Sequence, residues 1–211
     1  RDRIERAHAH GISVTAHMDS GFRNSVNPKD AILMGIDRVE HFLGGDLLSP
    51  ERSAFASLQE LTDEDLESPE FKEIVDLFVS HGVWFDATLT AYGYDSVEDD
   101  IYDQWTNEAQ YLAPEIQAWA AETEPRRYPQ FARIFWVKLK TIKRFYDAGG
   151  RITLGTDHVS TGRYLQGFSA HREMHAMSKA GIPNAAVLKI ATTNGARAMN
   201  VGDRRGTIEI G

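Results

Sequence analysis

The chain has 211 residues, no cysteine and a formal net charge of −8 at pH 7. Without cysteine there is no disulfide and no thiolate ligand, so any bound metal must be held by nitrogen and oxygen donors. The acidic balance argues against a nucleic-acid partner, because such binding relies on clustered Lys and Arg. The basic runs at 126–127 and 138–144 are expected to be solvated helix faces. No apolar run approaches the roughly 20 residues of a membrane-spanning helix.

Four times the chain passes from a helix-like stretch through glycine into a short apolar strand. Glycine just after a helix adopts the left-handed conformation that other residues resist, so it marks the change from helix to strand. The expected elements are, in chain order, a helix over 1–10, a strand over 12–16, a helix over 29–34, a strand over 36–41, an amphipathic helix over 71–81 with Phe71, Ile74, Val75, Phe78 and Val79 on its buried side, a strand over 83–90, two or three helices within 91–148, a strand over 151–157, a helix over 170–180 and a last helix from Pro183.

Strands that alternate with helices predict βα units with parallel strands. Four such units are too few for a closed eight-stranded barrel, which takes about 250 residues. The chain opens at Arg1 inside an expected helix and stops in GTIEIG, where a strand is expected to start. We therefore expect an α/β fold that forms the second half of a (β/α)8 TIM-type barrel.

Three of the strands finish on a residue type that can bind a metal, namely His17, His41 and Asp157. Because the carboxyl ends of parallel strands meet on one face of a barrel, these side chains are expected to surround a common centre. Neutral imidazole and carboxylate are the ligands that a metal such as zinc takes when no thiolate is present. A single histidine on a strand is more often a core residue, but the recurrence at one topological position favours a metal site or an acid–base site.

The segment over 91–148 is the longest departure from the βα repeat, with expected breaks near Pro125 and Pro129 and many aromatic residues. Long segments after a barrel strand commonly form lids or substrate walls. The alternative is a helical pair that packs its rings on the barrel exterior. Only Tyr92 and Tyr94, directly after the strand, are expected to line the pocket.

The chain has further histidines outside the three strand ends. His158 follows Asp157 and is expected to support the site or line its rim. His171 and His175 lie four residues apart in HREMH, on one helix face, but the central glutamate matches neither H-E-x-x-H nor H-x-x-E-H. That helix is expected to pack against the barrel, with His171 lining the pocket. The two histidines of AHAH at 7–10 diverge on a helix and are expected to be structural.

The sequence resembles the second half of the amidohydrolase superfamily of metal-dependent enzymes, in the segments VTAH, GIDRVEH, TLTAY, GTD and HREM…AGIPNAAVLKIATTNGARAMNVGDRRGTIEIG. The likeness is nearest to the branch of imidazolonepropionase-like and Xaa-Pro-dipeptidase-like enzymes, and the insertion over 95–145 is its weakest part. It implies that residues 1–206 hold barrel strands five to eight, with a helical insertion after strand seven. It also implies that 207–211 start a return toward a small β-sandwich domain.

The resemblance implies a hydrolase that cleaves an amide bond in a dipeptide or a cyclic amide by activating water at one or two divalent ions, most simply Zn²⁺. His17 and His41 match the ligands of strands five and six, and Asp157 matches the aspartate of strand eight, which acts as general base and then acid. The metal or His41 polarises the carbonyl oxygen, and Tyr92 matches a position that holds part of the substrate. The H-x-H of strand one and the lysine or glutamate of strand four belong before Arg1, so this segment alone is not expected to be active.

Two other functions stay open at this point. The same scaffold could act as a deaminase or esterase, or an inactive barrel could serve as a binding or assembly module. The sequence leaves metal number, a homo-oligomeric state and a cytoplasmic or exported location undecided, since a signal peptide would lie before Arg1.

Overall fold

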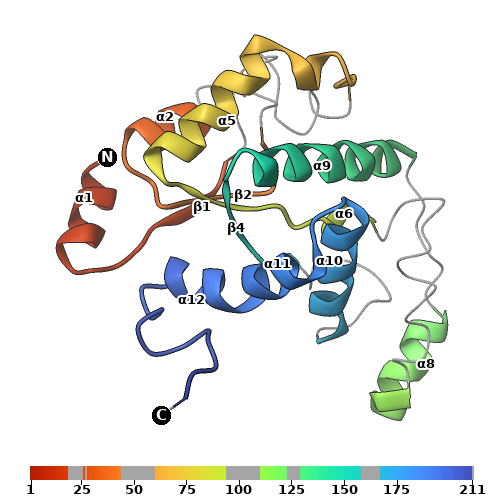
Figure 1. The fold of residues 1–211 in the computed structure, drawn as a ribbon. Helices are drawn as coiled ribbons and strands as arrows, with labels where there is room; N and C mark the ends of the chain where they lie inside the picture. The colour runs from red at the N-terminus through yellow and green to blue at the C-terminus, as the bar shows by residue number, and fades with distance from the viewer. Residues whose placement is uncertain are drawn as a thin grey trace.

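The computed structural model describes residues 1–18, 26, 28–43, 60–93, 110–122, 129–157 and 167–210. Figure 1 shows how its elements are arranged. In chain order they are α1 (Asp2–Ala9), β1 (Thr15–His17), α2 (Pro28–Leu33), β2 (Arg38–Glu40), the 3-10 helix η1 (Asp65–Glu67), α5 (Pro69–His81), β3 (Trp84–Asp86), α6 (Thr90–Gly93), α8 (Pro114–Glu122), α9 (Pro129–Asp147), β4 (Arg151–Thr153), α10 (Phe168–Lys179), α11 (Asn184–Lys189), the π-helical segment η3 (Ile190–Asn194) and α12 (Gly195–Ala198).

The four strands form one parallel sheet in the order β1-β2-β3-β4. Each strand is paired with the next strand along the chain, and helices lie in the connections, as expected for successive βα units. The predicted α/β fold with a parallel sheet is therefore confirmed. The sequence-based proposal that these strands are the second half of a closed barrel remains a prediction.

The two faces of the sheet differ because side chains alternate along a strand. The central residues Val39, Phe85 and Ile152 are paired in register and are buried. They point to the helical layer. Their neighbours point to the other face and, apart from Trp84, are polar: Arg38 Nε lies 2.9 Å from Glu40 Oε1. The sheet therefore places Val39, Phe85 and Ile152 beneath the helices and leaves mainly polar side chains on the opposite face.

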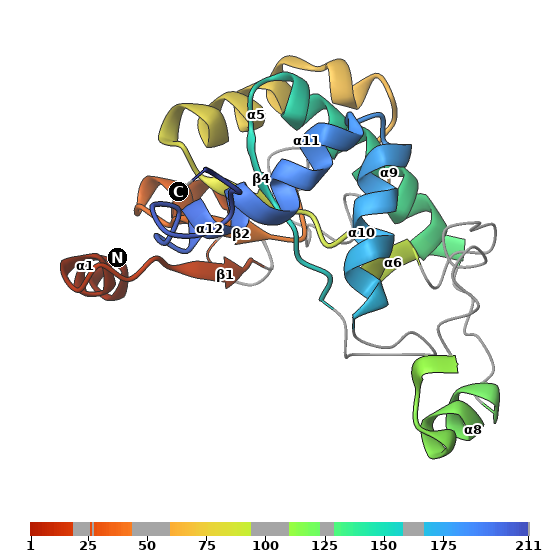
Figure 2. The same ribbon diagram turned by 60° about the horizontal axis from the view of Figure 1, so that its bottom comes forward.

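Aromatic rings join α5 and α9 to the sheet. Phe78 of α5, Phe85 of β3 and Phe145 of α9 meet edge to face, with ring centroids 5.7–6.1 Å apart. All three are almost completely buried. Edge-to-face pairs add about 0.5–1.5 kcal/mol each beyond the burial of their area. This cluster fixes the two helices on one face of the sheet, where Figures 1 and 2 both show them.

The predicted helix-to-strand changes at glycine are confirmed. Gly11, Gly35, Gly82 and Gly149 all have positive φ, from 65° to 94°. At Gly82 the left-handed residue ends α5, and the N–H group of Gly82 donates to Val79 O at 3.1 Å. Such a residue stops the helix and turns the chain into the next strand.

Two details of the prediction are wrong. The paired strands have three residues each, and the expected strand over 83–90 ends at Asp86 because Thr88 adopts a positive φ of 45° and α6 begins at Thr90. Val79, expected on the buried side of α5, has 38% of its surface exposed. It lies at the edge of the apolar stripe formed by Phe71, Ile74, Val75 and Phe78.

The connection between β3 and β4 contains α6, α8 and α9 within the described ranges, in keeping with the predicted helical insertion. Figures 1 and 2 show α8 standing apart from the sheet. Over this same connection, the basic run at 138–144 is only partly a solvated face. Lys140 and Arg144 pair with Asp63 and Glu67, whereas Lys138 is buried.

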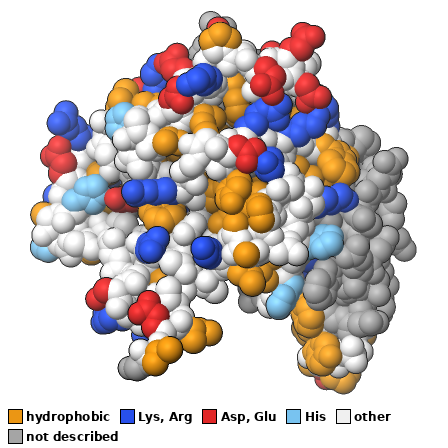
Figure 3. Space-filling model, viewed as in Figure 1, with side chains coloured by type: hydrophobic (Ala, Val, Ile, Leu, Met, Phe, Trp, Pro, Cys, Tyr) orange, Lys and Arg blue, Asp and Glu red, His pale blue; other side chains and the backbone are white. Residues whose placement is uncertain are grey.

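On the face shown in Figure 3, acidic and basic side chains are interspersed along α5 and α9. In the described part of the chain, no helix combines the length and apolar character needed to cross a bilayer. Near the end of the chain, residues 207–210 have no regular secondary structure, and the side chains of Ile208 and Ile210 are fully exposed. The domain boundary at 206 stays a prediction.

Candidate functional site

The structure brings His17, His41 and Asp157 together at the carboxyl ends of β1, β2 and β4. The ring centroids of His17 and His41 are 4.4 Å apart, and His41 Nδ1 lies 3.9 Å from Asp157 Oδ2. His17 is exposed, His41 is buried, and the Asp157 side chain is half exposed. The site therefore has a buried imidazole at its base and two donors that solvent can reach.

Two contacts fix the buried imidazole. The backbone N–H of His41 donates to Asp86 O at 2.8 Å, and His41 Nδ1 lies 2.8 Å from Thr88 Oγ1. Burial, together with the nearby Lys138 and His17, lowers the pKa of His41 to about 3. His41 is therefore a neutral imidazole near pH 7. When Nδ1 donates to Thr88, the Nε2 lone pair is left available as a ligand or acceptor.

Backbone strain is concentrated at this site. In the described ranges, four non-glycine residues have positive φ: His41 at 68°, Thr88 at 45°, Asp157 at 51° and Asn200 at 56°. The first three belong to the site. A positive φ is particularly costly for the β-branched Thr88. Such residues cluster where the surrounding structure holds functional groups in place, which supports a functional role for this end of the sheet.

Asp86 is a site residue that the sequence reasoning missed. It ends β3, has 4% of its surface exposed, and accepts a hydrogen bond from Thr153 Oγ1 at 3.1 Å. Asp86 Oδ1 is a buried oxygen without a hydrogen-bond partner among the described residues. Burial and the nearby Glu40 raise the pKa of Asp86 to about 6. Gly155 leaves the space that this carboxyl group occupies, because a Cβ there would lie 2.4 Å from Asp86 Oδ2.

Two more buried charges lie behind the site. Glu173 of α10 accepts hydrogen bonds from the N–H groups of Leu89 and Thr90, each at 2.8 Å. Lys138 of α9 donates to Thr88 O at 3.4 Å. Burial raises the pKa of Glu173 and lowers that of Lys138, and the opposite charges of the two groups favour the ionised form of Lys138. Both side chains therefore hold the turn after β3.

The residues expected to contact substrate lie in different surroundings. Tyr92 is half-buried in α6, with its ring centroid 5.7 Å from that of Phe42 and 4.0 Å from Lys138 Nζ. It therefore packs beside the site, next to the residue that follows His41. His171 is exposed on α10, with its ring centroid 6.2 Å from that of Phe168. His158 lies outside the described residues, as does Tyr94.

The donor types at the site fit a divalent cation, since zinc binds neutral imidazole and carboxylate. Two of the three possible contacts are present: the ring of His41 approaches the ring of His17, and it also approaches the carboxylate of Asp157. Within the described ranges, no three His, Asp or Glu side chains are arranged so that they could hold a metal ion by themselves. The chemistry of the donors thus supports a metal, and the metal itself remains a proposal.

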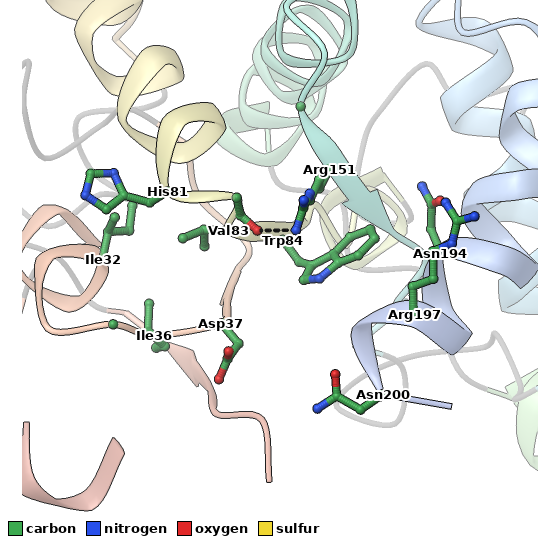
Figure 4. Close-up of a pocket in the computed structure, with 13 residues that line it drawn as sticks. Ile32, Ile36, Asp37, His81, Val83, Trp84, Arg151, Asn194, Arg197 and Asn200 are labelled. Atoms are coloured by element: carbon green, nitrogen blue, oxygen red, sulfur yellow. Dashed lines mark hydrogen bonds between the residues drawn. The ribbon is translucent and has the colours of Figure 1, made fainter. Parts of the chain in front are cut away.

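A cavity of about 680 Å³ lies at the opposite end of the sheet (Figure 4). It is lined where β3 and β4 begin, by Trp84 and Arg151, and by Asn194 and Arg197 from the last helical segments. Arg151 Nη1 donates to Gly82 O at 3.1 Å. In barrels of βα units the amino ends of the strands serve stability and the carboxyl ends carry the chemistry. We therefore place the candidate site at His41 and not in this cavity.

Three solved structures share the fold at low sequence identity. A Xaa-Pro dipeptidase with bound methionine in the active site has a TM-score of 0.58 at 19% identity, over 99% of this chain and 39% of its own. Bottromycin amidohydrolase has a TM-score of 0.56 at 21% identity, over 94% and 43%. Ochratoxinase from A. niger has a TM-score of 0.52 at 20% identity, over 96% and 34%. The chain thus spans less than half the length of each structure.

A comparison with curated protein sequences found none that matches. The sequence profile of the amidohydrolase family matches residues 3–211. The match includes all four strands and the three residues, His17, His41 and Asp157, that meet at their carboxyl ends. The chain belongs to the amidohydrolase family.

Proposed function

We propose that the intact protein is a metal-dependent hydrolase that cleaves the C–N bond of a dipeptide or a cyclic amide, and that β1 to β4 are strands five to eight of its barrel. The observation that carries this proposal is the meeting of His17, His41 and Asp157 at the carboxyl ends of three parallel strands. Family membership supports hydrolysis. The partial length of the chain relative to the solved structures makes the activity a proposal for the whole protein.

In this proposal His17, His41 and Asp157 contribute ligands to one or two divalent ions, with Zn²⁺ as the first choice. When bound, such an ion acts as a Lewis acid that lowers the pKa of water and polarises a carbonyl group. The burial that keeps His41 neutral suits it to this role, because a ligand imidazole must be deprotonated. The H-x-H pair and the lysine or glutamate that the family resemblance implies would complete the ligand set.

The residues of this chain handle the proton. Asp157 accepts the proton of the attacking water as its oxygen adds to the amide carbon, and then donates that proton to the nitrogen as the C–N bond breaks. Its half-exposed carboxylate can reach both water and substrate. His41, with Nδ1 engaged by Thr88, would contribute by holding the ion through its other ring nitrogen. The nearby ring of Tyr92 supports part of the substrate, packed against Phe42.

The proposal is tested with full-length protein and a panel of substrates. Xaa-Pro dipeptides come first, because the fold is shared with a Xaa-Pro dipeptidase, followed by other dipeptides, cyclic amides, esters and amino-purines. We expect metal-dependent release of the amine from one class of amide. Turnover of esters or amino-purines alone would replace amide hydrolysis by esterase or deaminase activity. No turnover of any substrate, with no bound metal, would favour the binding-module alternative.

Two substitutions test the assigned residues. Asp157→Asn should lower kcat by about 10²–10⁴-fold, the usual contribution of general acid–base catalysis. His17→Ala should lower metal content and turnover together. Both residues have exposed side chains, so circular dichroism and thermal unfolding should show an intact fold. The matched controls are Asp147→Asn and His81→Ala, which change exposed residues away from the site. Near-normal turnover in either site variant would remove that residue from the mechanism.

A further inference from the structure

The turn that follows β3 links the candidate site to two helices behind it. Thr88 lies in this turn and reaches the ring of His41, with 2.8 Å between Thr88 Oγ1 and His41 Nδ1. Thr88 has a positive φ of 45°, which a β-branched residue rarely adopts. Something outside the turn must therefore stabilise this conformation, since strained residues persist only when their surroundings hold them.

Glu173 provides that support. Its Oε1 accepts from the N–H of Leu89 and its Oε2 from the N–H of Thr90, both at 2.8 Å. These are the two residues directly after Thr88, and they lead into α6. Glu173 and Thr90 are completely buried, so the two N–H groups have no solvent to replace the carboxylate. A buried N–H group that loses its acceptor costs free energy, so the carboxylate specifies this one backbone conformation.

Lys138 makes a second contact with the same turn. Its Nζ donates to Thr88 O at 3.4 Å and lies 4.0 Å from the centroid of the Tyr92 ring. The turn is therefore clamped between α9 and α10, through one positive and one negative group that both lie in the protein interior. Burying charged groups is costly, and in some proteins such groups serve to fix one arrangement of the residues around them. Here the arrangement that they fix is the position of the Thr88 hydroxyl.

We propose that Glu173 is a positioning residue, which holds the turn at Leu89 and Thr90 so that the Thr88 hydroxyl keeps the His41 ring in one orientation and one tautomer. This inference rests on the proposed function in one respect, namely that the free nitrogen of His41 serves the metal. A partner on one ring nitrogen commonly fixes the tautomer of a ligand histidine, and removing such a partner costs about 10–100-fold in metal affinity.

The first test needs no metal and no substrate. Long-range ¹H–¹⁵N spectra of full-length, metal-free protein labelled in histidine report the tautomer of each ring, and the His41→Asn variant assigns the His41 signals. We expect His41 to carry its proton on Nδ1. Glu173→Gln, which keeps the size of the side chain but cannot accept both N–H groups, should produce a mixture of tautomers. Thr88→Val should do the same, and Thr88→Ser, which keeps the hydroxyl, should retain the wild-type spectrum.

The matched control is Ser178→Ala, which removes a hydroxyl from the far end of α10, where Ser178 Oγ donates to Met174 O. It should leave the His41 signals unchanged. If Glu173→Gln folds and retains the wild-type tautomer, Glu173 does not position His41 and the inference is wrong. If Glu173→Gln does not fold, Thr88→Val and Thr88→Ser decide whether the turn controls the ring: equal spectra in these two variants would also contradict the inference.

The second test measures Zn²⁺ affinity by competition with a chromophoric chelator. Thr88→Val and Glu173→Gln should each weaken affinity about tenfold or more. The double variant should bind Zn²⁺ no more weakly than the weaker-binding single variant, because both substitutions act through one hydroxyl. If the losses of Zn²⁺ affinity in the two single variants multiply in the double variant, Glu173 acts by another route and the inference is wrong. Absence of Zn²⁺ binding in the wild-type protein would contradict the proposed function, and the tautomer spectra would still decide the role of Glu173.

Discussion

Gly155 offers a sharp test of how the ends of β3 and β4 fit together. A Cβ atom at this position would lie 2.4 Å from Asp86 Oδ2 and 2.7 Å from Asp86 Oδ1. Real Cβ atoms essentially never approach other atoms below 3.0 Å, so either the Asp86 carboxyl group or the chain after β4 must move. The Asp86 side chain is short and buried and is bonded to Thr153, which limits its escape. Gly155→Ala should therefore destabilise the protein and disturb the segment that carries Asp157.

The size of the effect follows from two contributions. Adding a methyl group to a filled space costs about 1–3 kcal/mol. If the carboxyl group turns away, the hydrogen bond from Thr153 to a charged acceptor is lost, at about 1.5–3 kcal/mol. A domain of this size loses about 2–4 °C in Tm for each kcal/mol. Thermal and urea unfolding of Gly155→Ala should therefore show a clear drop in stability, of several degrees in Tm.

Gly195→Ala is the matched control, because Gly195 is helical and a Cβ there meets nothing within 4 Å. It should be neutral or stabilise the protein by up to about 1 kcal/mol, as alanine favours helix over glycine. In an Asp86→Ala background the cost of Gly155→Ala should largely disappear, since the clashing group is absent. Wild-type stability of Gly155→Ala, or an equal cost in both backgrounds, would refute the contact between Gly155 and Asp86.

Three further predictions concern the core, the surface and the metal. Phe145→Ala should cost about 3–5 kcal/mol in urea unfolding, because the ring is fully buried against Phe78 and Phe85, and a cost below 1 kcal/mol would contradict that packing. Arg144→Ala should cost at most about 1 kcal/mol, because its partner Glu67 is exposed to solvent, and a larger loss would show that the pair is less screened than its exposure implies. Chelation should lower the Tm of the wild-type full-length protein but not that of His17→Ala, since a bound metal stabilises only the native state, and an equal shift in both would remove His17 from the ligand set.

The regular part of the fold can be predicted from the sequence because its signals are local. Glycines such as Gly82 mark the ends of helices through their backbone conformation alone, and the apolar stripe of α5 identifies its buried face. The meeting of His41 with His17 and Asp157 also follows from a simple rule, that parallel strands end on the same side. The ends of β2 and β3 could not be predicted in this way, because the positive φ values of His41 and Thr88 that follow them depend on tertiary contacts.

The buried charged residues behind the site, Lys138 and Glu173, can be recognised less easily in the sequence. Lys138 shares a helical stripe with the buried residues Ile134, Phe135 and Ile142, so its spacing places it inside although it lies in a basic run. Glu173 similarly shares a stripe with Ala176 and Met177. A charged residue at an apolar position of a helix is therefore worth noting in such sequences. The bond between Thr88 and His41 joins residues 47 positions apart and becomes visible only in the folded structure.

The most direct test of the central claim is a crystal structure of the full-length protein with anomalous data collected at the zinc edge. The account predicts an anomalous peak at the carboxyl ends of β1, β2 and β4, with nitrogen atoms of His17 and His41 and an oxygen atom of Asp157 as ligands at about 2.0–2.2 Å from one or two ions. A protein with full hydrolytic activity whose metal lies elsewhere, or whose His17, His41 and Asp157 do not contact the metal, would contradict it.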